Sequence, residues 1–150
     1  MAGWYGCDFD ATLAFYDVWN NGELGQPIPK MLERVRRHIE NGDEVRIFTA
    51  RVATFPGMSD ESAKMIEEER TKIQDWAQKY LGVRLQVTCQ KDYACILIYD
   101  DRARQVEPNT GKLIEDLYKT LEQENILLRS TIELLSQKEN SLVKELRQNG

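Results

Sequence analysis

An unbroken apolar run from Ile96 to Tyr99 constrains the fold of this 150-residue chain more than any other stretch. Such runs are typical of strands buried on both faces, as in parallel sheets, whereas half-solvated strands alternate apolar and polar residues. Three further short segments, at 5–9, 45–49 and 84–89, have the composition of strands. Helix-like segments separate the first three strands, and this order predicts an open, mostly parallel α/β sheet with helices on both faces.

The helix-like segments carry start and stop signals. Pro29 suits the first turn of a helix, and the apolar residues between 31 and 39 follow helical spacing. A second helix is expected from a cap at Ser59 or Asp60 to about Tyr80, shortly before a glycine.

Polar side chains follow each of the predicted strands. They are Asp8 and Asp10 after the first, Thr49 and Arg51 after the second, Lys91 after the third, and Asp100 and Asp101 after the fourth. Open α/β sheets bind their ligands at the carboxyl ends of the strands, so we expect these side chains to meet there. Alternation along the first strand puts Asp8 and Asp10 on one side.

Carboxylates gathered at one place repel one another and need compensation. Mg²⁺ provides it, because this cation prefers carboxylate and phosphate oxygens as ligands. A lysine and a threonine hydroxyl suit phosphate oxygens. The set therefore indicates phosphoryl transfer, in which one aspartate is the nucleophile and a second carboxylate transfers the proton.

The motifs, in this order, resemble those of the haloacid dehalogenase superfamily of Mg²⁺-dependent phosphatases. "DFDAT" is similar to its DxDxT loop, "RIFTA" to its strand ending in Thr or Ser, Lys91 to its third-motif lysine, and "IYDD" to its paired acidic motif. The resemblance spans residues 5–101 and implies a Rossmann-like sheet and a small phosphatase without a cap domain. One departure is Ala11, where many members carry glycine.

The resemblance also implies the residue roles. Asp8 is the expected nucleophile and Asp10 the acid/base, and Asp10 also offers a backbone carbonyl to the metal. Thr49 and Lys91 are expected to hold the phosphoryl group. The expected Mg²⁺ ligands are Asp8, Asp10, Asp100 and Asp101.

The strings "TAR" and "DDRA" extend the likeness to the 3′-phosphatase domain of phage polynucleotide kinase. There an arginine at the position of Arg51 helps to hold phosphate. The expected function is a Mg²⁺-dependent phosphomonoester hydrolase acting through an aspartyl-phosphate. Its expected substrate is a phosphorylated small molecule or nucleotide, with a nucleic-acid 3′-phosphate end as a further candidate. The alternative is a catalytically silent scaffold of the same fold.

Each motif also has an ordinary structural explanation when it is taken alone. A DxD pair is common in solvated turns, paired aspartates cap helices, threonine favours strands, and arginines form structural ion pairs. The single histidine, His38, is expected to be a solvated surface residue. A receiver-like signalling domain uses similar residues, but in the reverse order along the chain.

The C-terminal segment has a heptad pattern. One position of the repeat is Ile114, Leu121, Leu128, Leu135 and Leu142, and the other is Tyr118, Asn125, Ile132, Glu139 and Leu146. This pattern predicts a long helix that forms a homodimer or higher oligomer through residues 113–147. The expected domains are 1–112 and 113–150. The alternative is an amphipathic helix packed on its own domain. The off-seam Leu127 and Leu134 widen the apolar face, which favours either this alternative or a higher oligomer.

Composition limits the partners further. The net charge of −5 argues against broad electrostatic binding to nucleic acid. No apolar run is long enough to cross a membrane and residues 1–6 lack a signal pattern, so a cytoplasmic protein without a membrane partner is expected. The three cysteines are an odd number and are expected to be reduced, with a reactive thiol at Cys7 as the alternative.

Overall fold

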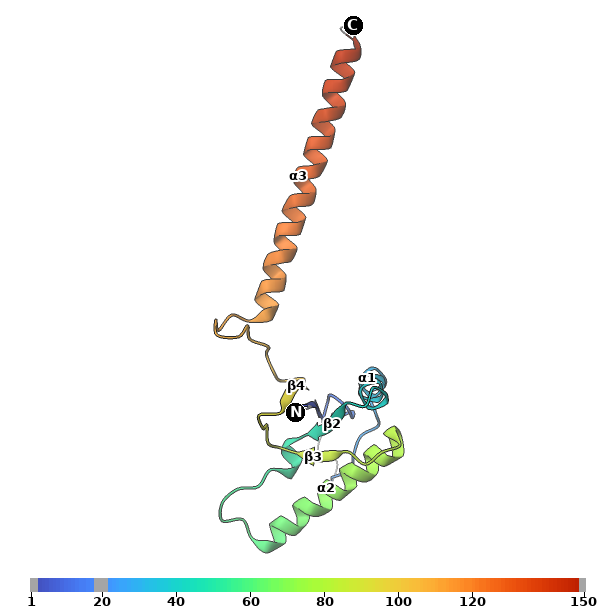
Figure 1. The fold of residues 1–150 in the computed structure, drawn as a ribbon, viewed down its shortest axis with the longest axis vertical. Helices are drawn as coiled ribbons and strands as arrows, with labels where there is room; N and C mark the ends of the chain where they lie inside the picture. Colours follow the sequence, from blue (N-terminus) through green and yellow to red (C-terminus); the bar gives the residue numbers. More distant parts are fainter. Residues whose placement is uncertain (1–2, 18–21, 149–150) are drawn as a thin grey trace. The chain divides into compact units, whose positions relative to one another are not determined.

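The computed structural model describes residues 3–17 and 22–148 of the chain. The chain divides into two units, Met1–Ala103 and Arg104–Gly150. The first unit holds a sheet and two helices, and the second holds one long helix and the turn that precedes it (Figure 1).

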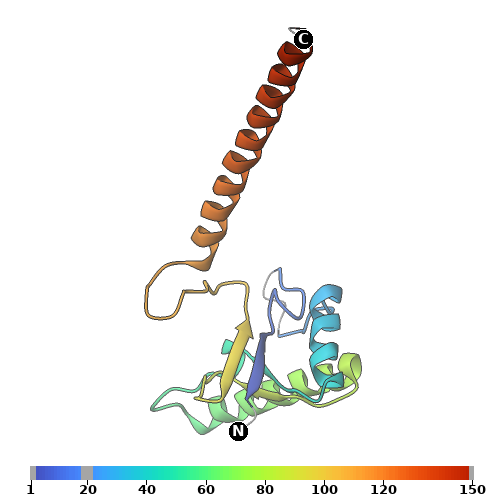
Figure 2. The same ribbon diagram turned by 45° about the horizontal axis from the view of Figure 1, so that its top comes forward.

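The sheet has four strands, and all of its pairings are parallel. They are β1 (Trp4–Asp8), β2 (Glu44–Phe48), β3 (Gln86–Thr88) and β4 (Cys95–Tyr99), in the order β3-β2-β1-β4. Figure 2 shows β1 and β4 side by side, with β4 at the edge of the described sheet. The predicted α/β fold with a parallel sheet is confirmed, and the carboxyl ends of all four strands lie along one edge.

Two α-helices connect the first three strands, and both have the predicted bounds to within two residues. Helix α1 (Pro29–Glu40) has its proline in the first turn. Helix α2 (Asp60–Leu81) is capped by Ser59, whose hydroxyl oxygen accepts a hydrogen bond from the backbone N–H of Ser62. It ends at Gly82, whose φ of 80° is a left-handed conformation that glycine adopts without strain.

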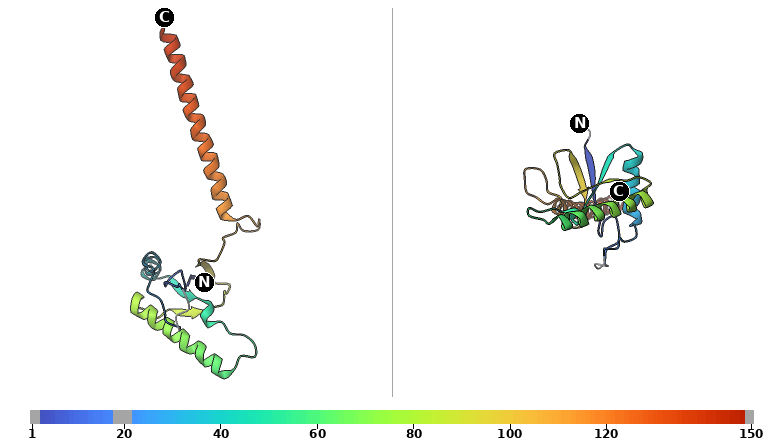
Figure 3. Two further views of the ribbon diagram at one scale, coloured as in Figure 1. Left: turned by 180° about the vertical axis from the view of Figure 1, so that it is seen from behind. Right: turned by 90° about the horizontal axis from the view of Figure 1, so that it is seen from below.

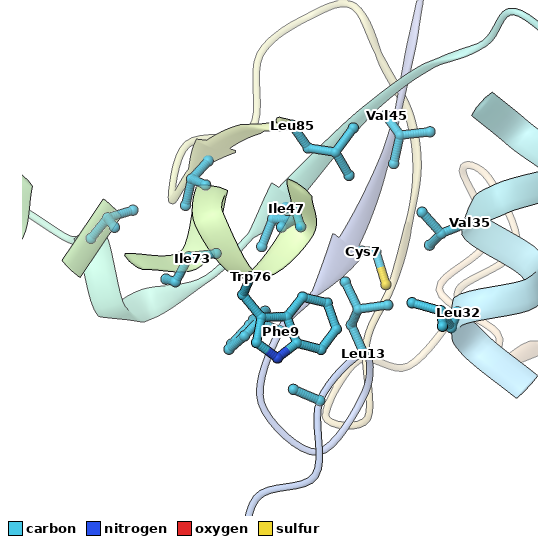
Figure 4. Close-up of a cluster of buried hydrophobic side chains, with 14 residues drawn as sticks. Cys7, Phe9, Leu13, Leu32, Val35, Val45, Ile47, Ile73, Trp76 and Leu85 are labelled. Carbon is cyan, nitrogen blue, oxygen red and sulfur yellow. The ribbon is translucent and has the colours of Figure 1, made fainter. Parts of the chain in front are cut away.

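The buried core lies on one face of the sheet. Cys7, Ile47 and Val87 are register partners across β1, β2 and β3, so they share that face. Both helices pack against it, through the side chains of Leu32, Val35, Ile73, Trp76 and Ala77 (Figures 3 and 4). Burial raises the pKa of the Cys7 thiol to about 12, which keeps this cysteine protonated and unreactive.

The sequence predicted helices on both faces, and the described helices of this unit share one. The reason is the path of the chain. Both crossovers step in the same direction, from β1 to β2 and from β2 to β3, and right-handed crossovers in one direction place their helices on one side. On the other face the Trp4 ring is fully buried, and the Arg46 guanidinium lies over it at 4.5 Å from the ring centroid.

His38 is not the solvated residue that the sequence suggested. Its Nδ1 lies 2.7 Å from Asp43 Oδ2, its Nε2 lies 3.1 Å from the Tyr99 hydroxyl, and its ring stacks on Tyr5. The side chain therefore links α1 to the last residue of β4.

The second unit begins with a turn and continues as α3 (Ile114–Gln148), a helix of 35 residues. A bridge between Val106 and Leu113 closes the turn, and the Ile114 N–H donates to the carbonyl of Gln105. The expected domain boundary, after residue 112, falls inside this turn. Among the described helices, none is long and apolar enough to cross a membrane.

The amino-terminal edge of the sheet depends on Asp92, whose carboxylate accepts hydrogen bonds from Trp4 Nε1 at 2.7 Å and from Arg46 Nη1 at 2.8 Å. We expect Asp92→Ala to lower the free energy of unfolding, because it leaves the indole N–H of a buried ring without its acceptor. Urea unfolding followed by circular dichroism measures this. Lys91→Ala at the next position is the matched control, and an equal loss in both variants would contradict the prediction.

Candidate active site

A cavity of about 360 Å³ lies at the carboxyl ends of the strands. It brings together five of the seven predicted site residues and a second arginine. These are Asp8, Asp10, Thr49, Arg51, Asp100 and Arg102. They come from the ends of β1, β2 and β4, as the parallel topology requires. We call this hollow the main cavity.

Three carboxylates form a cluster beside the main cavity. One carboxylate oxygen each from Asp8, Asp100 and Asp101 lies within 4.8 Å of the others. Two hydrogen bonds fix the acidic pair after β4: the Arg102 N–H donates to Asp100 Oδ1 at 2.7 Å, and the Asp101 N–H donates to the Thr12 hydroxyl at 3.2 Å. A set of oxygen donors at this spacing can hold a hard divalent cation.

The cluster perturbs the proton affinity of Asp8. Partial burial raises the pKa of its carboxyl group to about 6, and the negative charges of Asp100, Asp101 and Asp10 act in the same direction. A hydrogen bond from the Phe9 backbone opposes them in part. Without a bound cation, the ionised form of Asp8 is therefore less favourable than that of an ordinary aspartate.

Asp10 belongs to a different group, although it lies only two residues along the chain. Arg51 clamps its carboxylate with two hydrogen bonds, from Nε at 2.7 Å and from Nη2 at 2.8 Å. A further hydrogen bond of this guanidinium runs from Nη1 to Glu69 Oε1 at 2.7 Å. The hydrogen bonds to Asp10, followed by those to Glu69, raise the pKa of Arg51, which stays charged. The Asp10 carboxylate, which was predicted to be a metal ligand, therefore pairs with an arginine and is not part of the three-carboxylate cluster.

Thr49 is almost fully buried at the start of a short 3-10 helix, η1 (Ala50–Val52). Its hydroxyl oxygen accepts a hydrogen bond from the Arg51 N–H at 3.3 Å, and its own N–H donates to the Thr88 carbonyl. The residue therefore lines the main cavity and also fixes the turn that presents Arg51.

The structure does not bring Lys91 to the main cavity. The chain turns back directly after Thr88, and Asp92 is already tied to Trp4 and Arg46 at the opposite edge of the sheet. The charge of Lys91 acts instead on Cys95, at the start of β4. Only residues 89–94 connect the carboxyl end of β3 to the amino end of β4, so Lys91 lies in a short connection that runs back toward the amino-terminal edge. The cations that line the main cavity are Arg51 and Arg102.

Sequence reasoning missed two residues that position the site. Thr12 joins the first loop to the acidic pair through Asp101, and the DxDxT pattern contained the signal for it. Glu69 holds Arg51 from α2, but it is one of three consecutive glutamates, and nothing in the sequence separates it from the others.

Ala11 has a φ of 59°, in the left-handed region that glycine adopts at no steric cost. The Leu13 and Ala14 N–H groups both donate to the Phe9 carbonyl, and these bonds hold the tight loop around it. The alanine at this position therefore carries backbone strain where a glycine would carry none.

No family model and no curated protein matches this chain. Among solved structures, a conserved protein coded by a locus of Bacteroides thetaiotaomicron superposes with a TM-score of 0.40 at 17% identity. The match covers 83% of this chain and 93% of that chain. A likeness this distant carries no argument about the site.

The raised pKa of Asp8 makes a prediction for the metal-free protein. Its carboxyl has a pKa of about 6 in the folded state against 3.8 ordinarily, so the folded state loses stability as the pH rises from about 4 through about 6. In EDTA at pH 7.5, we therefore expect Asp8→Asn to melt at a higher temperature than the wild type, with a difference that shrinks toward pH 4. Asp17→Asn, at an exposed aspartate, is the control. A lower melting temperature for Asp8→Asn at pH 7.5 would contradict the prediction.

Proposed function

We propose that this protein is a Mg²⁺-dependent phosphomonoester hydrolase that acts through an aspartyl-phosphate on Asp8. One observation carries the proposal: Asp8 belongs to a three-carboxylate cluster and lines the same cavity as the Asp10–Arg51 pair. A nucleophile, a proton-transferring carboxylate and fixed positive charge in one cavity are the parts that phosphoryl transfer needs. The order of the motifs along the chain, similar to that of the haloacid dehalogenase superfamily, supports the same reaction.

The donor set suits Mg²⁺. The side chains of Asp8, Asp100 and Asp101 offer only carboxylate oxygens, the ligands that this hard cation prefers. When bound, Mg²⁺ supplies charge neutralisation to the carboxylates and to the phosphoryl oxygens.

The proposed reaction consists of two successive displacements at phosphorus. A carboxylate oxygen of Asp8 forms a bond to phosphorus as the bond from phosphorus to the ester oxygen breaks, and Asp10 in its protonated form gives the leaving oxygen a proton. Asp10 then takes a proton from water, whose oxygen attacks the phosphorus and breaks its bond to Asp8. Each oxygen of Asp10 accepts one hydrogen bond from Arg51 in the structure, and each keeps a second lone pair that can take the transferred proton.

The phosphoryl group would be held by Thr49, Arg51 and Arg102 rather than by Lys91. The first three line the main cavity, and Lys91 does not. The main cavity is open to solvent, and the 3′-phosphatase-like strings "TAR" and "DDRA" lie at its rim. These features support a nucleotide or another phosphorylated small molecule as substrate, and a nucleic-acid 3′-phosphate end is a second candidate.

Phosphate release from p-nitrophenyl phosphate and from a panel of nucleotides and 3′-phosphorylated oligonucleotides tests the proposal. We expect Mg²⁺-dependent release that falls at least about a thousandfold in Asp8→Asn, because the nucleophile is lost. Lys91→Ala is the matched control, since its charge lies outside the main cavity, and we expect it to retain the activity. Release at equal rates from Asp8→Asn and wild type would reject the hydrolase and leave the scaffold alternative.

We also propose that α3 joins two copies of the chain as a parallel coiled coil. The side chains of Leu121, Leu128 and Leu135 are 53%, 59% and 61% exposed, although they share one seam of the helix. Asn125 occupies a core position of the same seam, where an asparagine favours two parallel strands in fixed register. In that register, Glu124 of each helix faces Arg129 of the other, which adds charge complementarity. An isolated helix gains little stability from helix propensity alone. Burial of this seam against a second copy of α3 would stabilise the 35-residue helix.

Adjacent leucines give a matched test of the coiled coil. We expect Leu128→Lys, in the seam, to shift the mass in light scattering from dimer to monomer, because it places two cations face to face. Leu127→Lys, off the seam at 68% exposure, should remain dimeric. A monomeric wild type, or a loss of the dimer only in Leu127→Lys, would contradict the arrangement.

A further inference from the structure

A second hollow adjoins the main cavity. It has a volume of about 400 Å³, and both hollows are lined by Ala11 and Asp100. We call it the side groove. Its other walls come from the first loop, from the start of α1 and from the end of β4, and include Thr12, Ile28, Lys30, Met31, Arg34 and Tyr99. A substrate whose phosphoryl group lies in the main cavity has this groove as the adjoining space for its leaving group.

The side groove combines apolar walls with two cations. Ile28, Met31 and the Tyr99 ring supply the apolar surface. Lys30 and Arg34 are four residues apart on α1, so they project from one side of the helix. The Arg34 guanidinium lies 5.2 Å from the centroid of the Tyr99 ring, an arrangement in which the arginine stacks and still offers its N–H donors.

These cations differ from most arginines of the first unit in having no carboxylate partner among residues 3–17 and 22–103. Arg37, Arg46, Arg51, Arg70 and Arg84 all form ion pairs there. Lys30 and Arg34 form none with the described residues, although carboxylates border the same groove. Two positive charges on an apolar wall, next to a phosphoryl site, are suited to a second anionic group on the same ligand.

We propose that the side groove binds a second phosphate of the substrate, so that the preferred substrates are phosphomonoesters of a bulky apolar or aromatic alcohol that carries another phosphate. A nucleoside bisphosphate has this chemistry. The inference rests on the proposed hydrolase, whose main cavity holds the reacting phosphoryl group. Asp100 and Asp101 also border the groove, and their charges repel an anion until a divalent cation neutralises them. Binding in the groove therefore requires Mg²⁺.

Kinetics on matched nucleotides test the assignment. We expect kcat/KM for adenosine 3′,5′-bisphosphate to exceed the values for adenosine 3′-monophosphate and adenosine 5′-monophosphate by about tenfold or more. A gain of this size corresponds to one charge-assisted hydrogen bond to the second phosphate. In Arg34→Gln, the ratio of kcat/KM for the bisphosphate to that for p-nitrophenyl phosphate should fall by a similar factor, through a higher KM. Arg37→Gln, on the same helix but outside the groove, should keep the wild-type ratio. The same ratio in both variants, or no preference for the bisphosphate in the wild type, overturns the proposal.

A binding measurement separates this proposal from the hydrolase itself. Adenosine 3′,5′-bisphosphate is titrated calorimetrically into Asp8→Asn, with Mg²⁺ or with EDTA. Mg²⁺-dependent binding that weakens about tenfold when Arg34→Gln is added supports the groove, even if the wild type releases no phosphate. If the wild type releases phosphate but Arg34→Gln does not change the affinity for the bisphosphate, the proposed hydrolase stands and the proposed role of the side groove is overturned.

Discussion

The contact between Arg51 and Asp10 is the interaction on which the arrangement of the site depends. Four aspartates lie close together at one edge of the sheet, and the guanidinium removes one of them from the group by pairing with both of its oxygens. The remaining three form the cluster suited to a cation. Glu69 holds the other side of Arg51, so a residue on α2 determines which carboxylate stands apart. The division of labour proposed for Asp8 and Asp10 follows from this pairing, since their places along the chain are nearly equivalent.

The parts of the site that were predicted from sequence are those that strand topology determines. Asp8 ends a parallel strand and Thr49 and Asp100 directly follow two others, and parallel strands bring their carboxyl ends to one edge whatever the details of packing. Lys91 shows where that reasoning ends. It follows a strand too, but the connection from β3 to β4 is so short that the chain is already returning to the amino-terminal edge at Lys91.

Side-chain partners were beyond the reach of sequence for a different reason. Glu69 and His38 lie on helices α2 and α1, where the spacing of apolar residues predicts a helix but says nothing about polar contacts. Glu69 meets Arg51 and His38 meets Tyr99 only because the packed core brings each helix next to a residue that is distant in sequence. The sequence also did not determine which face of the sheet each helix covers. Two right-handed crossovers in one direction put α1 and α2 on the same face.

The position of β4 has a consequence for how the site assembles. This strand pairs with β1 on one side and is the edge of the described sheet on the other, yet it carries Asp100 and Asp101. Edge strands open locally at a lower free energy than central ones. Two carboxylates of the cluster, Asp100 and Asp101, therefore follow an edge strand, and the third, Asp8, ends a central one. A ligand that contacts Asp8 together with Asp100 or Asp101 joins the edge strand to the central strand, so part of its binding energy stabilises the pairing of β4 with β1.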